Sequence, residues 1–187
     1  MIKKIISRIY FGVLKMAYAT KSNIKSVSGV FKSHQPVVLR GKGSLEFGDN
    51  VNLGVINSPF FYNAYAYIEA RNESALIKFG NNININNSFS AVAEKSIAIE
   101  DNVLIGYNCS IIDSDFHGLH PLERNANKQN SASVLISKNV FIGNNVCILK
   151  GVTIGENTVV ASNAVVTKSF PENVIIGGNP AKIIRDL

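Results

Sequence analysis

The sequence predicts an all-β solenoid, and three observations lead to that fold class. An aliphatic residue recurs at every sixth position from Ile136 to Val166. A second row of mostly small residues follows each aliphatic by four positions, from Val140 to Ala164. A helix brings together residues three and four apart, whereas six residues make three strand alternations, so one short strand plus a tight corner fits the period. Because no single repeat can bury its own aliphatic side chain, the repeats must stack as coils.

The N-terminal residues 1–35 are expected to form a basic amphipathic helix and a linker. Apolar residues recur at helical spacing up to Ala17, and residues 1–32 contain seven Lys or Arg and no Asp or Glu. Lys15 interrupts the apolar stretch, leaving 9–14 too short for a signal peptide or a membrane span. Two interpretations stay open: a helix packed on the solenoid or a neighbouring subunit, or peripheral membrane contact through residues 1–20.

Residues 36–187 are expected to form the solenoid domain. The polar segment from Ile24 to Gln35 is a linker or an irregular strand, and the repeats begin at Val37. An aromatic run between Asn57 and Tyr67 interrupts the repeats. It is interpreted either as a strand at an interface or as one wall of a sugar site. Asparagine tolerates the left-handed backbone of tight corners, so five asparagines there are mostly structural. They are Asn81, Asn82, Asn84, Asn86 and Asn87.

Composition limits the classes of partner. The net charge of +6 comes from the N-terminal segment, and the rest of the chain is nearly neutral, which argues against nucleic-acid binding. Cys109 and Cys147 are both assigned to inward positions, which favours thiols buried in the core and argues against a cysteine nucleophile. Two core thiols also suit a cytoplasmic protein. No spacing of His or Cys indicates a metal site, so no metal is expected.

The hexads stop in one extended loop, at about 112–133. A solenoid accommodates an insertion as a loop leaving one corner, and long loops in compact folds are often functional. This one contains two of the three histidines, His117 and His120. Imidazole titrates near neutral pH, so a histidine here is a candidate general base.

The hexads, together with the ending Gly178–Leu187, resemble the hexapeptide-repeat acyltransferases, in particular the branch of galactoside, maltose and xenobiotic O-acetyltransferases. The resemblance covers residues from about Gly41 to the C-terminus. It implies a left-handed parallel β-helix, with acetyl-CoA as co-substrate and a carbohydrate acceptor. It also implies a homotrimer whose active sites lie between adjacent subunits.

The resemblance also implies residue roles. His117 matches the catalytic histidine, and Asn87, thirty residues earlier, matches an acceptor-binding asparagine. Phe141 stands where the family has a tryptophan, which keeps apolar packing but loses the indole N–H. Arg124 matches an expected arginine, and His120 is a candidate substrate contact. The imidazole of His117 would be oriented by a backbone carbonyl or by a loop carboxylate, namely Asp113, Asp115 or Glu123.

Further positions match contacts to coenzyme A. They are Asn144, Ser162, Thr167 and Lys168, with Lys182 and Arg185 at the phosphate end. Two cations in the C-terminal tail suit phosphate groups, although a solvated charged tail would have the same composition.

These features predict an acetyl-CoA-dependent O-acetyltransferase acting on a sugar hydroxyl, in surface polysaccharide biosynthesis, in the cytoplasm or at the inner face of the membrane. The residues flanking His117 differ from the usual His-Pro of the sugar acetyltransferases, which leaves the acceptor open. Two alternatives remain. One is an N-acetyltransferase acting on an amino sugar, which needs the same kind of base. The other is a non-catalytic β-helical scaffold.

Overall fold

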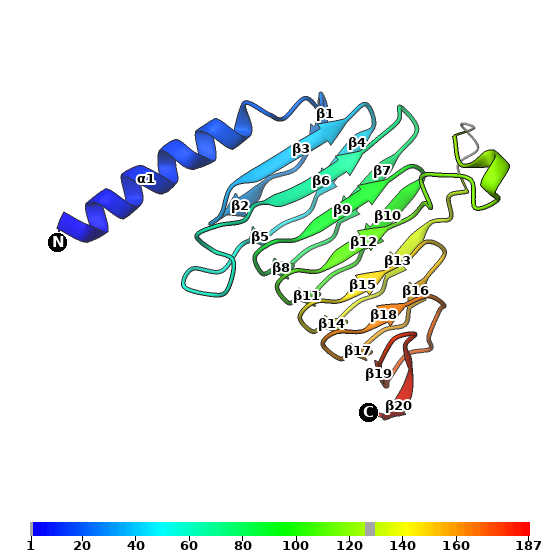
Figure 1. Ribbon diagram of the computed structural model, residues 1–187. Coiled ribbons are helices and arrows are strands. Elements are labelled where there is room, and N and C mark those ends of the chain that lie inside the picture. The colour runs from blue at the N-terminus through cyan, green and yellow to red at the C-terminus, as the bar shows by residue number, and fades with distance from the viewer. Residues whose placement is uncertain (1, 126–129) are drawn as a thin grey trace.

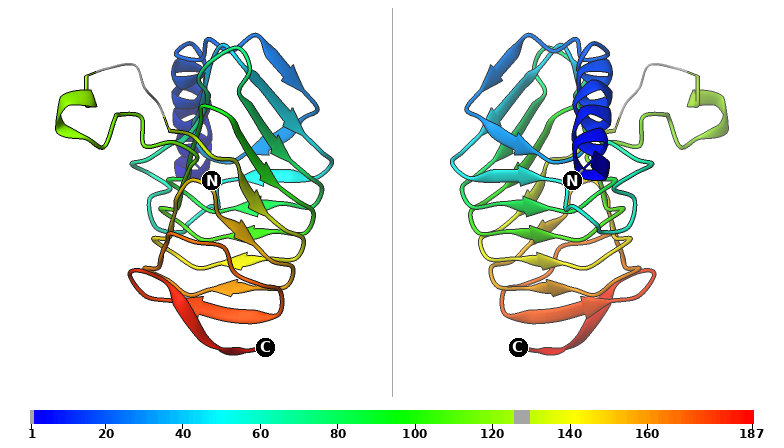
Figure 2. Two further views of the ribbon diagram at one scale, coloured as in Figure 1. Left: turned by 90° about the vertical axis from the view of Figure 1, so that its right-hand side faces the viewer. Right: turned by 90° about the vertical axis from the view of Figure 1, so that its left-hand side faces the viewer.

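The chain winds into a left-handed parallel β-helix with one extended loop and an N-terminal helix (Figure 1). The structure is a computed structural model that describes residues 2–125 and 130–187, with side chains from Ile9 onward in the helix. Three sheets form the three sides of the stack, and helix α1 (Ile2–Ala19) precedes the first coil (Figure 2).

Six coils each contribute one short strand to each sheet, and β19 and β20 then extend one sheet. Every strand pair is parallel except the last, β19 with β20. Sheet A consists of β1 (Ser26–Ser28), β4 (Ser44–Phe47), β7 (Leu76–Phe79), β10 (Ser96–Ile99), β13 (Val134–Ile136) and β16 (Thr153–Ile154). Sheet B consists of β2 (Phe31–Ser33), β5 (Val51–Leu53), β8 (Asn84–Ile85), β11 (Leu104–Ile105), β14 (Phe141–Ile142), β17 (Val159–Val160), β19 (Val174–Gly177) and β20 (Lys182–Asp186). Sheet C consists of β3 (Val37–Gly41), β6 (Ala66–Ala70), β9 (Ser90–Ala93), β12 (Ser110–Ile112), β15 (Cys147–Ile148) and β18 (Val165–Val166).

The predicted hexad residues form the core. Strand register places like positions above one another, for example Ile99 beside Ile136 and Ile136 beside Ile154. All six aliphatics of the predicted row are at most 1% exposed, namely Ile136, Ile142, Ile148, Ile154, Val160 and Val166. The period of six therefore predicted both the solenoid and its buried face correctly.

The corner joining sheet A to sheet B, called the A–B corner, is regular. In six successive coils it contains an asparagine with positive φ, and these are Asn50, Asn82, Asn102, Asn139, Asn157 and Asn173. Their side chains bond from coil to coil, as Asn139 does to Asn157 and Asn157 to Asn173, both at 2.8 Å. Asparagine adopts this left-handed backbone more readily than other non-glycine residues, so the sequence supplies it where the corner needs it.

The solenoid begins before residue 36. Strands β1 and β2 pair in parallel with β4 and β5, so the segment expected to be a linker or an irregular strand contains two short strands of the first coil. Its polarity follows from its place at the open end, where the β1 side chains are exposed.

Of the side chains that the structure describes in helix α1, those on one side pack on the rod. The Phe11 ring of this helix lies 4.7 Å from the Phe61 ring, and Lys15 donates a hydrogen bond to the Ser33 carbonyl. On its other side Ile9, Val13 and Met16 are 56–65% exposed. Figure 1 shows the helix extending sideways away from the rod. The predicted basic face includes Lys3, Lys4 and Arg8, whose side chains lie outside the described residues. In the described chain, no helix combines the length and apolarity needed to cross a bilayer.

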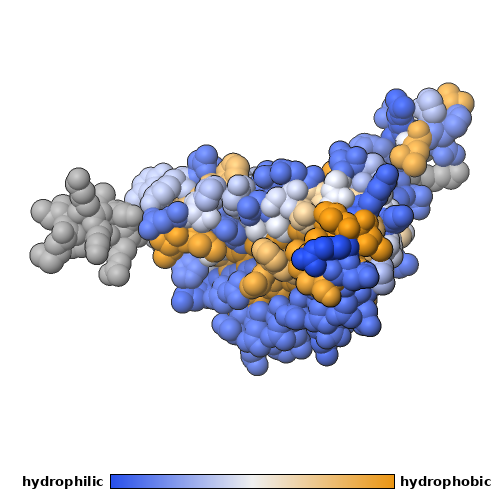
Figure 3. All heavy atoms as spheres, turned by 90° about the horizontal axis from the view of Figure 1, so that it is seen from below, coloured by the Kyte–Doolittle hydropathy of each residue, from blue (hydrophilic) through white to orange (hydrophobic). Residues whose placement is uncertain are grey.

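Apolar patches also interrupt the hydrophilic surface at the C-terminal end of the stack, which Figure 3 views from below. Ile183, Ile184 and Leu187 are each at least half exposed there.

Candidate active site

The extended loop leaves the corner between sheets C and A, called the C–A corner, after β12 and returns to β13 (Figure 1). Its two ends are held side by side. The Ala132 N–H donates to the Asp113 carbonyl at 2.8 Å, and Ser114 forms an isolated antiparallel bridge with Ser131. Lys150, from the next coil, forms an ion pair with Asp115. The base of the loop is therefore fixed to the rod.

Asp113 anchors this base and does not orient the imidazole. Its carboxylate is fully buried and accepts the backbone N–H groups of Glu94 and Lys95, both at 2.7 Å. Burial raises the pKa of Asp113, and the two N–H donors oppose that shift. Asp115 is paired with Lys150.

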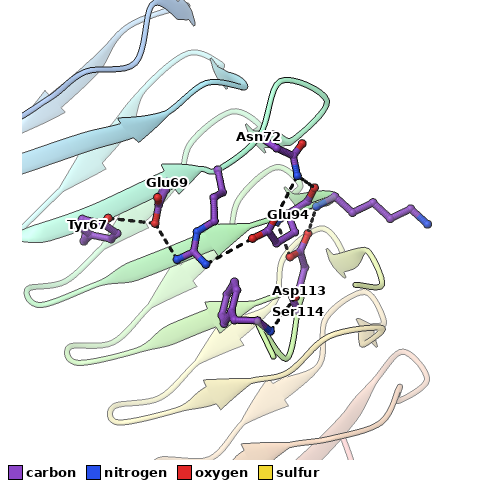
Figure 4. Close-up of polar contacts among 9 residues, drawn as sticks. Tyr67, Glu69, Asn72, Glu94, Asp113 and Ser114 are labelled. Atoms are coloured by element: carbon purple, nitrogen blue, oxygen red, sulfur yellow. Dashed lines mark hydrogen bonds and ion pairs between the residues drawn. The ribbon is translucent and has the colours of Figure 1, made fainter. Parts of the chain in front are cut away.

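A polar network on the C–A side supports the residue before the candidate base (Figure 4). Arg71 forms ion pairs with Glu69 at 3.2 Å and Glu94 at 3.4 Å, and its guanidinium lies 4.4 Å from the centre of the Phe116 ring. Phe116 has φ +59°, a strained left-handed backbone for a bulky residue, and its N–H donates to the Ser114 hydroxyl. Such strain persists only where the surroundings hold it, and it is common at functional sites.

His117 follows directly and is exposed. Its Nδ1 lies 3.1 Å from the carbonyl oxygen of Arg124. A carbonyl only accepts hydrogen bonds, so we assign the proton of the neutral imidazole to Nδ1. That tautomer leaves the lone pair on Nε2, the atom that can take a proton from an acceptor. The carbonyl is the orienting group, one of the alternatives that the sequence left open.

His120 has a local structural role. It is the N-cap of the 3-10 helix η1 (Pro121–Glu123), where its Nδ1 accepts the Leu122 N–H at 3.3 Å. Arg124 ends that helix, so one short helix places the carbonyl that His117 uses. The arginine side chain is exposed in the loop.

Asn87 is placed differently from the sequence expectation. Its side chain is fully buried at the B–C corner, the corner between sheets B and C. The amide oxygen accepts the Val55 N–H, and the amide nitrogen donates to the carbonyls of Val55 and Pro59. These bonds fasten the aromatic loop, residues 54–65, to the rod. The amide of this chain therefore faces its own backbone and not an open site.

Four of the remaining implied residues divide between the two edges of sheet C. Thr167 and Lys168 follow β18 at the C–A corner, the same side as the loop. Asn144 and Ser162 lie at the B–C corner, where their side-chain oxygens accept the N–H groups of Tyr107 and Asn144. Phe141 is on the outer face of sheet B and 48% exposed, and Lys182 and Arg185 are exposed on β20. One chain does not bring this set together.

The two cysteines differ, which corrects the sequence assignment. Cys109 is buried, and burial raises the pKa of its thiol to about 11. Cys147 points outward from β15, because Val146 and Ile148 occupy the inward positions. Cys147 is the sixth residue of its hexad, not the fifth, and adjacent strand residues face opposite sides. In the part of the chain that the structure describes, no group of His, Cys, Asp or Glu could hold a metal ion.

Comparison with known proteins agrees with the repeat and the fold. Residues 133–168 match the family model "bacterial transferase hexapeptide (six repeats)", and residues 96–114 match the "hexapeptide repeat of succinyl-transferase". A galactoside acetyltransferase solved in complex with coenzyme A is 27% identical, with a TM-score of 0.56, and the match covers 94% of this chain and 68% of that one.

Two further structures share the fold at lower identity. A hexapeptide-repeat acetyltransferase from Vibrio cholerae, complexed with acetyl-CoA, is 24% identical over 96% of this chain and 86% of that one, with a TM-score of 0.57. The N-acyltransferase AntD from Bacillus cereus, complexed with dTDP and coenzyme A, is 20% identical over 86% and 83%, with a TM-score of 0.65. The chain is thus a hexapeptide-repeat protein, and it has the repeats and the fold of the hexapeptide-repeat acyltransferases.

Sequence reasoning missed the support beneath the loop. Nothing in the spacing marks Arg71, which lies 45 residues before Phe116 and reaches it only because coils stack. The one available signal was the aromatic residue next to His117.

Proposed function

We propose that this protein is an acyltransferase that moves the acetyl group of acetyl-CoA to a sugar hydroxyl, with His117 as general base. The observation that carries the proposal is the bond between Nδ1 of His117 and the Arg124 carbonyl, which orients the ring and leaves Nε2 for proton transfer. The galactoside acetyltransferase similar to this chain supports the acyl donor and the acceptor class.

The chemistry needs little beyond a base. The acceptor hydroxyl oxygen attacks the thioester carbonyl carbon while Nε2 of His117 takes the hydroxyl proton. Collapse of the tetrahedral intermediate breaks the carbon–sulfur bond, and the imidazolium returns the proton to the departing thiolate. The products are an acetyl ester and free coenzyme A. This direct transfer forms no acyl-cysteine. Cys109 is buried with a raised pKa, and the outward-facing Cys147 is left without a role, which Cys147→Ser tests.

The coenzyme would be held by residues of this chain that suit its parts. Lys182 and Arg185 are exposed cations on β20 that fit phosphate groups. Thr167 and Lys168 lie on the catalytic side, whereas Asn144 and Ser162 occupy the opposite corner. Phe141 offers an exposed apolar ring, and the Arg124 side chain, which is exposed in the loop, would contact the acceptor. Asn87 would act indirectly, by holding the aromatic loop.

The division of these residues favours a site shared between copies. A homotrimer would set the C–A corner of one subunit against the B–C corner of the next, so that His117 and Lys168 of one copy face Asn144 of its neighbour. Sedimentation of the full chain should therefore give three times the monomer mass, and a monomer that is fully active would contradict the shared site.

We place the enzyme in the cytoplasm, at the inner face of the membrane, acting on surface polysaccharide. Unpaired cysteines suit a reducing compartment. The exposed Ile9, Val13 and Met16 of α1, next to the basic N-terminal sequence, suit an anionic lipid surface. Flotation with anionic liposomes should carry the full chain and not a chain lacking residues 1–20, and equal flotation would favour a helix that only packs.

An amino-sugar acceptor is the second candidate. An amine needs the same base, and the fold shared with AntD favours keeping this alternative. A panel of hydroxyl and amino sugars separates the two by product, because an ester is cleaved by mild base and an amide is not.

The deciding experiment measures thiol release from acetyl-CoA with that panel. His117→Ala should lower turnover about 10²–10⁴-fold. The comparison is His120→Ala, which removes an exposed imidazole of the same loop. Turnover close to that of wild type would leave His120 as a cap only, and a loss of turnover would support the substrate contact. Equal turnover of wild type and His117→Ala would remove His117 from the base role. Absence of turnover in every protein with every acceptor would favour the scaffold.

A further inference from the structure

A polar groove runs along the outer face of sheet C, between the aromatic loop and the C–A corner. Its upper part has a volume of about 560 Å³. The polar lining of this part consists of Tyr18, Lys21, Arg40, Tyr65, Tyr67, Arg71 and one carboxylate, Glu69, which is bonded to Arg71 and to the Tyr67 hydroxyl. The lower part, about 460 Å³, shares Tyr65 and Tyr67 with the upper part. The two parts therefore adjoin at these two tyrosines on successive coils, and they are called the groove below.

The upper part combines aromatic rings with cations. The rings of Tyr18 and Tyr65 lie 4.9 Å apart, and the Lys21 ammonium lies 4.4 Å from the centre of the Tyr18 ring. Arg40 donates a hydrogen bond to the Lys21 carbonyl. Within the described chain neither Lys21 nor Arg40 forms an ion pair with a carboxylate, whereas Arg71 is paired with Glu69 and Glu94. Two cations in this groove are thus available to a ligand.

The lower part offers small polar groups. Ser90 and Ser110 are neighbours on the outer face of β9 and β12, and Asn63 and Asn108 line the same stretch. Hydroxyl and amide side chains of this kind hydrogen-bond to sugar hydroxyls, while the tyrosine rings can pack against the apolar face of a pyranose. Each part is large enough for a sugar ring, so the two adjoining parts suit more than one ring.

The upper part of the groove reaches Arg71, which supports the loop that carries His117. Arg71 lines the groove on one side, and its guanidinium packs on the ring of Phe116, the residue before His117 (Figure 4). Occupation of the groove would therefore be felt at the candidate base through one shared side chain.

We propose that this groove binds an anionic oligosaccharide, with Arg40 and Lys21 on its carboxylate or phosphate and Tyr65 and Tyr67 against its rings. The inference rests on the proposed function, for which it names the acceptor class. Arginine and lysine bind both kinds of anion, so the two sources must be separated by experiment.

The test measures binding to the full chain by calorimetry, without acetyl-CoA, using three probes: trigalacturonate, galactose 1-phosphate and the neutral galactotriose. At least one anionic probe should bind about tenfold or more tighter than galactotriose, and its binding should weaken with added salt. Preference for trigalacturonate identifies a sugar acid, and preference for galactose 1-phosphate identifies a sugar phosphate. Equal binding of all three, or no binding of either anion, overturns the proposal.

Variants locate the site. Arg40→Gln should weaken the preferred anion about tenfold and leave galactotriose unchanged, whereas Arg40→Lys should keep most of the affinity. Tyr65→Ala should weaken charged and neutral probes alike. The matched control is Lys138→Gln, an exposed lysine at the A–B corner, which should change nothing. Unchanged anion binding in Arg40→Gln, with thermal unfolding equal to wild type, would also overturn the proposal.

These outcomes are separable from failure of the catalytic proposal. His117→Ala should bind the anionic probe as wild type does. Anion binding without acetyl transfer to any sugar would support the binding groove and contradict the catalytic proposal. Acetyl transfer to neutral sugars without anion binding would support the catalytic proposal and contradict the groove.

Discussion

The A–B and C–A corners turn the same chain by the same amount, yet they are built in opposite ways. The A–B corner repeats one left-handed asparagine in six coils, with amides bonded from coil to coil. The C–A corner has no such row among the described residues, and it contains the buried Asp113, the Arg71 network and the extended loop. The regular corner holds the stack together, and the irregular one is where chemistry can be placed.

The largest expected effect tests the regular corner. Asn157→Ala removes the bonds to Asn139 and Asn173 and forces a Cβ-bearing residue without a polar tip to keep φ near +61°. We expect a loss of about 3 kcal/mol in the free energy of unfolding, about 1 kcal/mol from the backbone and the rest from the hydrogen bonds. Asn157→Gly, which accepts this φ, should recover the backbone part. Urea unfolding of both variants measures the difference, and equal losses would mean that backbone strain is unimportant here.

A smaller effect is expected at Asp113, where the C–A corner is buried. Both carboxylate oxygens of Asp113 accept a backbone N–H, so Asp113→Asn turns an amide NH₂ toward one of these donors. We expect a loss of about 2 kcal/mol in the free energy of unfolding. The pKa of Asp113 is raised in the folded state, so its protonated form is favoured by folding. The contribution of Asp113 to the free energy of unfolding is therefore complete below its ordinary pKa of 3.8. It is lost as the pH rises through the pKa that Asp113 has in the folded state. Unfolding measured between pH 4 and 8 should show this decline in wild type only. A decline of the same size in Asp113→Asn would assign it to another group.

The base of the loop should respond in activity more than in stability. Lys150→Gln removes the partly buried ion pair with Asp115, worth about 1 kcal/mol or less. A looser base misplaces His117, and we expect acetyl transfer to fall about tenfold. Lys138→Gln, a cation at the regular corner, is the control. A tenfold loss in the control as well would show that general charge, not the position of the loop, matters.

The smallest effect distinguishes the cysteines. Ellman's reagent should modify Cys147 in the native protein and leave Cys109 unmodified, because a buried thiol with a pKa of about 11 forms almost no thiolate at pH 8. Cys147→Ser should abolish native labelling without loss of acetyl transfer. Labelling that persists in Cys147→Ser would place Cys109 within reach of solvent.

The sequence predicted what a strict period determines. Six-residue spacing located the inward rows because every coil uses the same register, and the interruption of that spacing located His117. It predicted poorly where the register shifts or ends. Cys147 was assigned one position too early in its hexad, and the first coil looked like a linker because its end is exposed.

The tasks of Asn87 and His120 depend on which backbone groups lie nearby, and a period does not report that. Asn87 meets Val55 and Pro59 only after a whole coil has stacked, and His120 caps a single short turn. For the same reason the contact between Arg71 and Phe116 was invisible before the fold was known.

The meeting of the two loop ends has a consequence for how such a protein can change. The Ala132 N–H and the Asp113 carbonyl are bonded at 2.8 Å, so the segment between them starts and finishes at nearly one point. Doubling the length of a flexible segment closed in this way costs only about 0.6 kcal/mol. The length of this segment can therefore change while the rod continues unchanged beneath it, and a new segment that keeps His117 and the Arg124 carbonyl could serve a different acceptor.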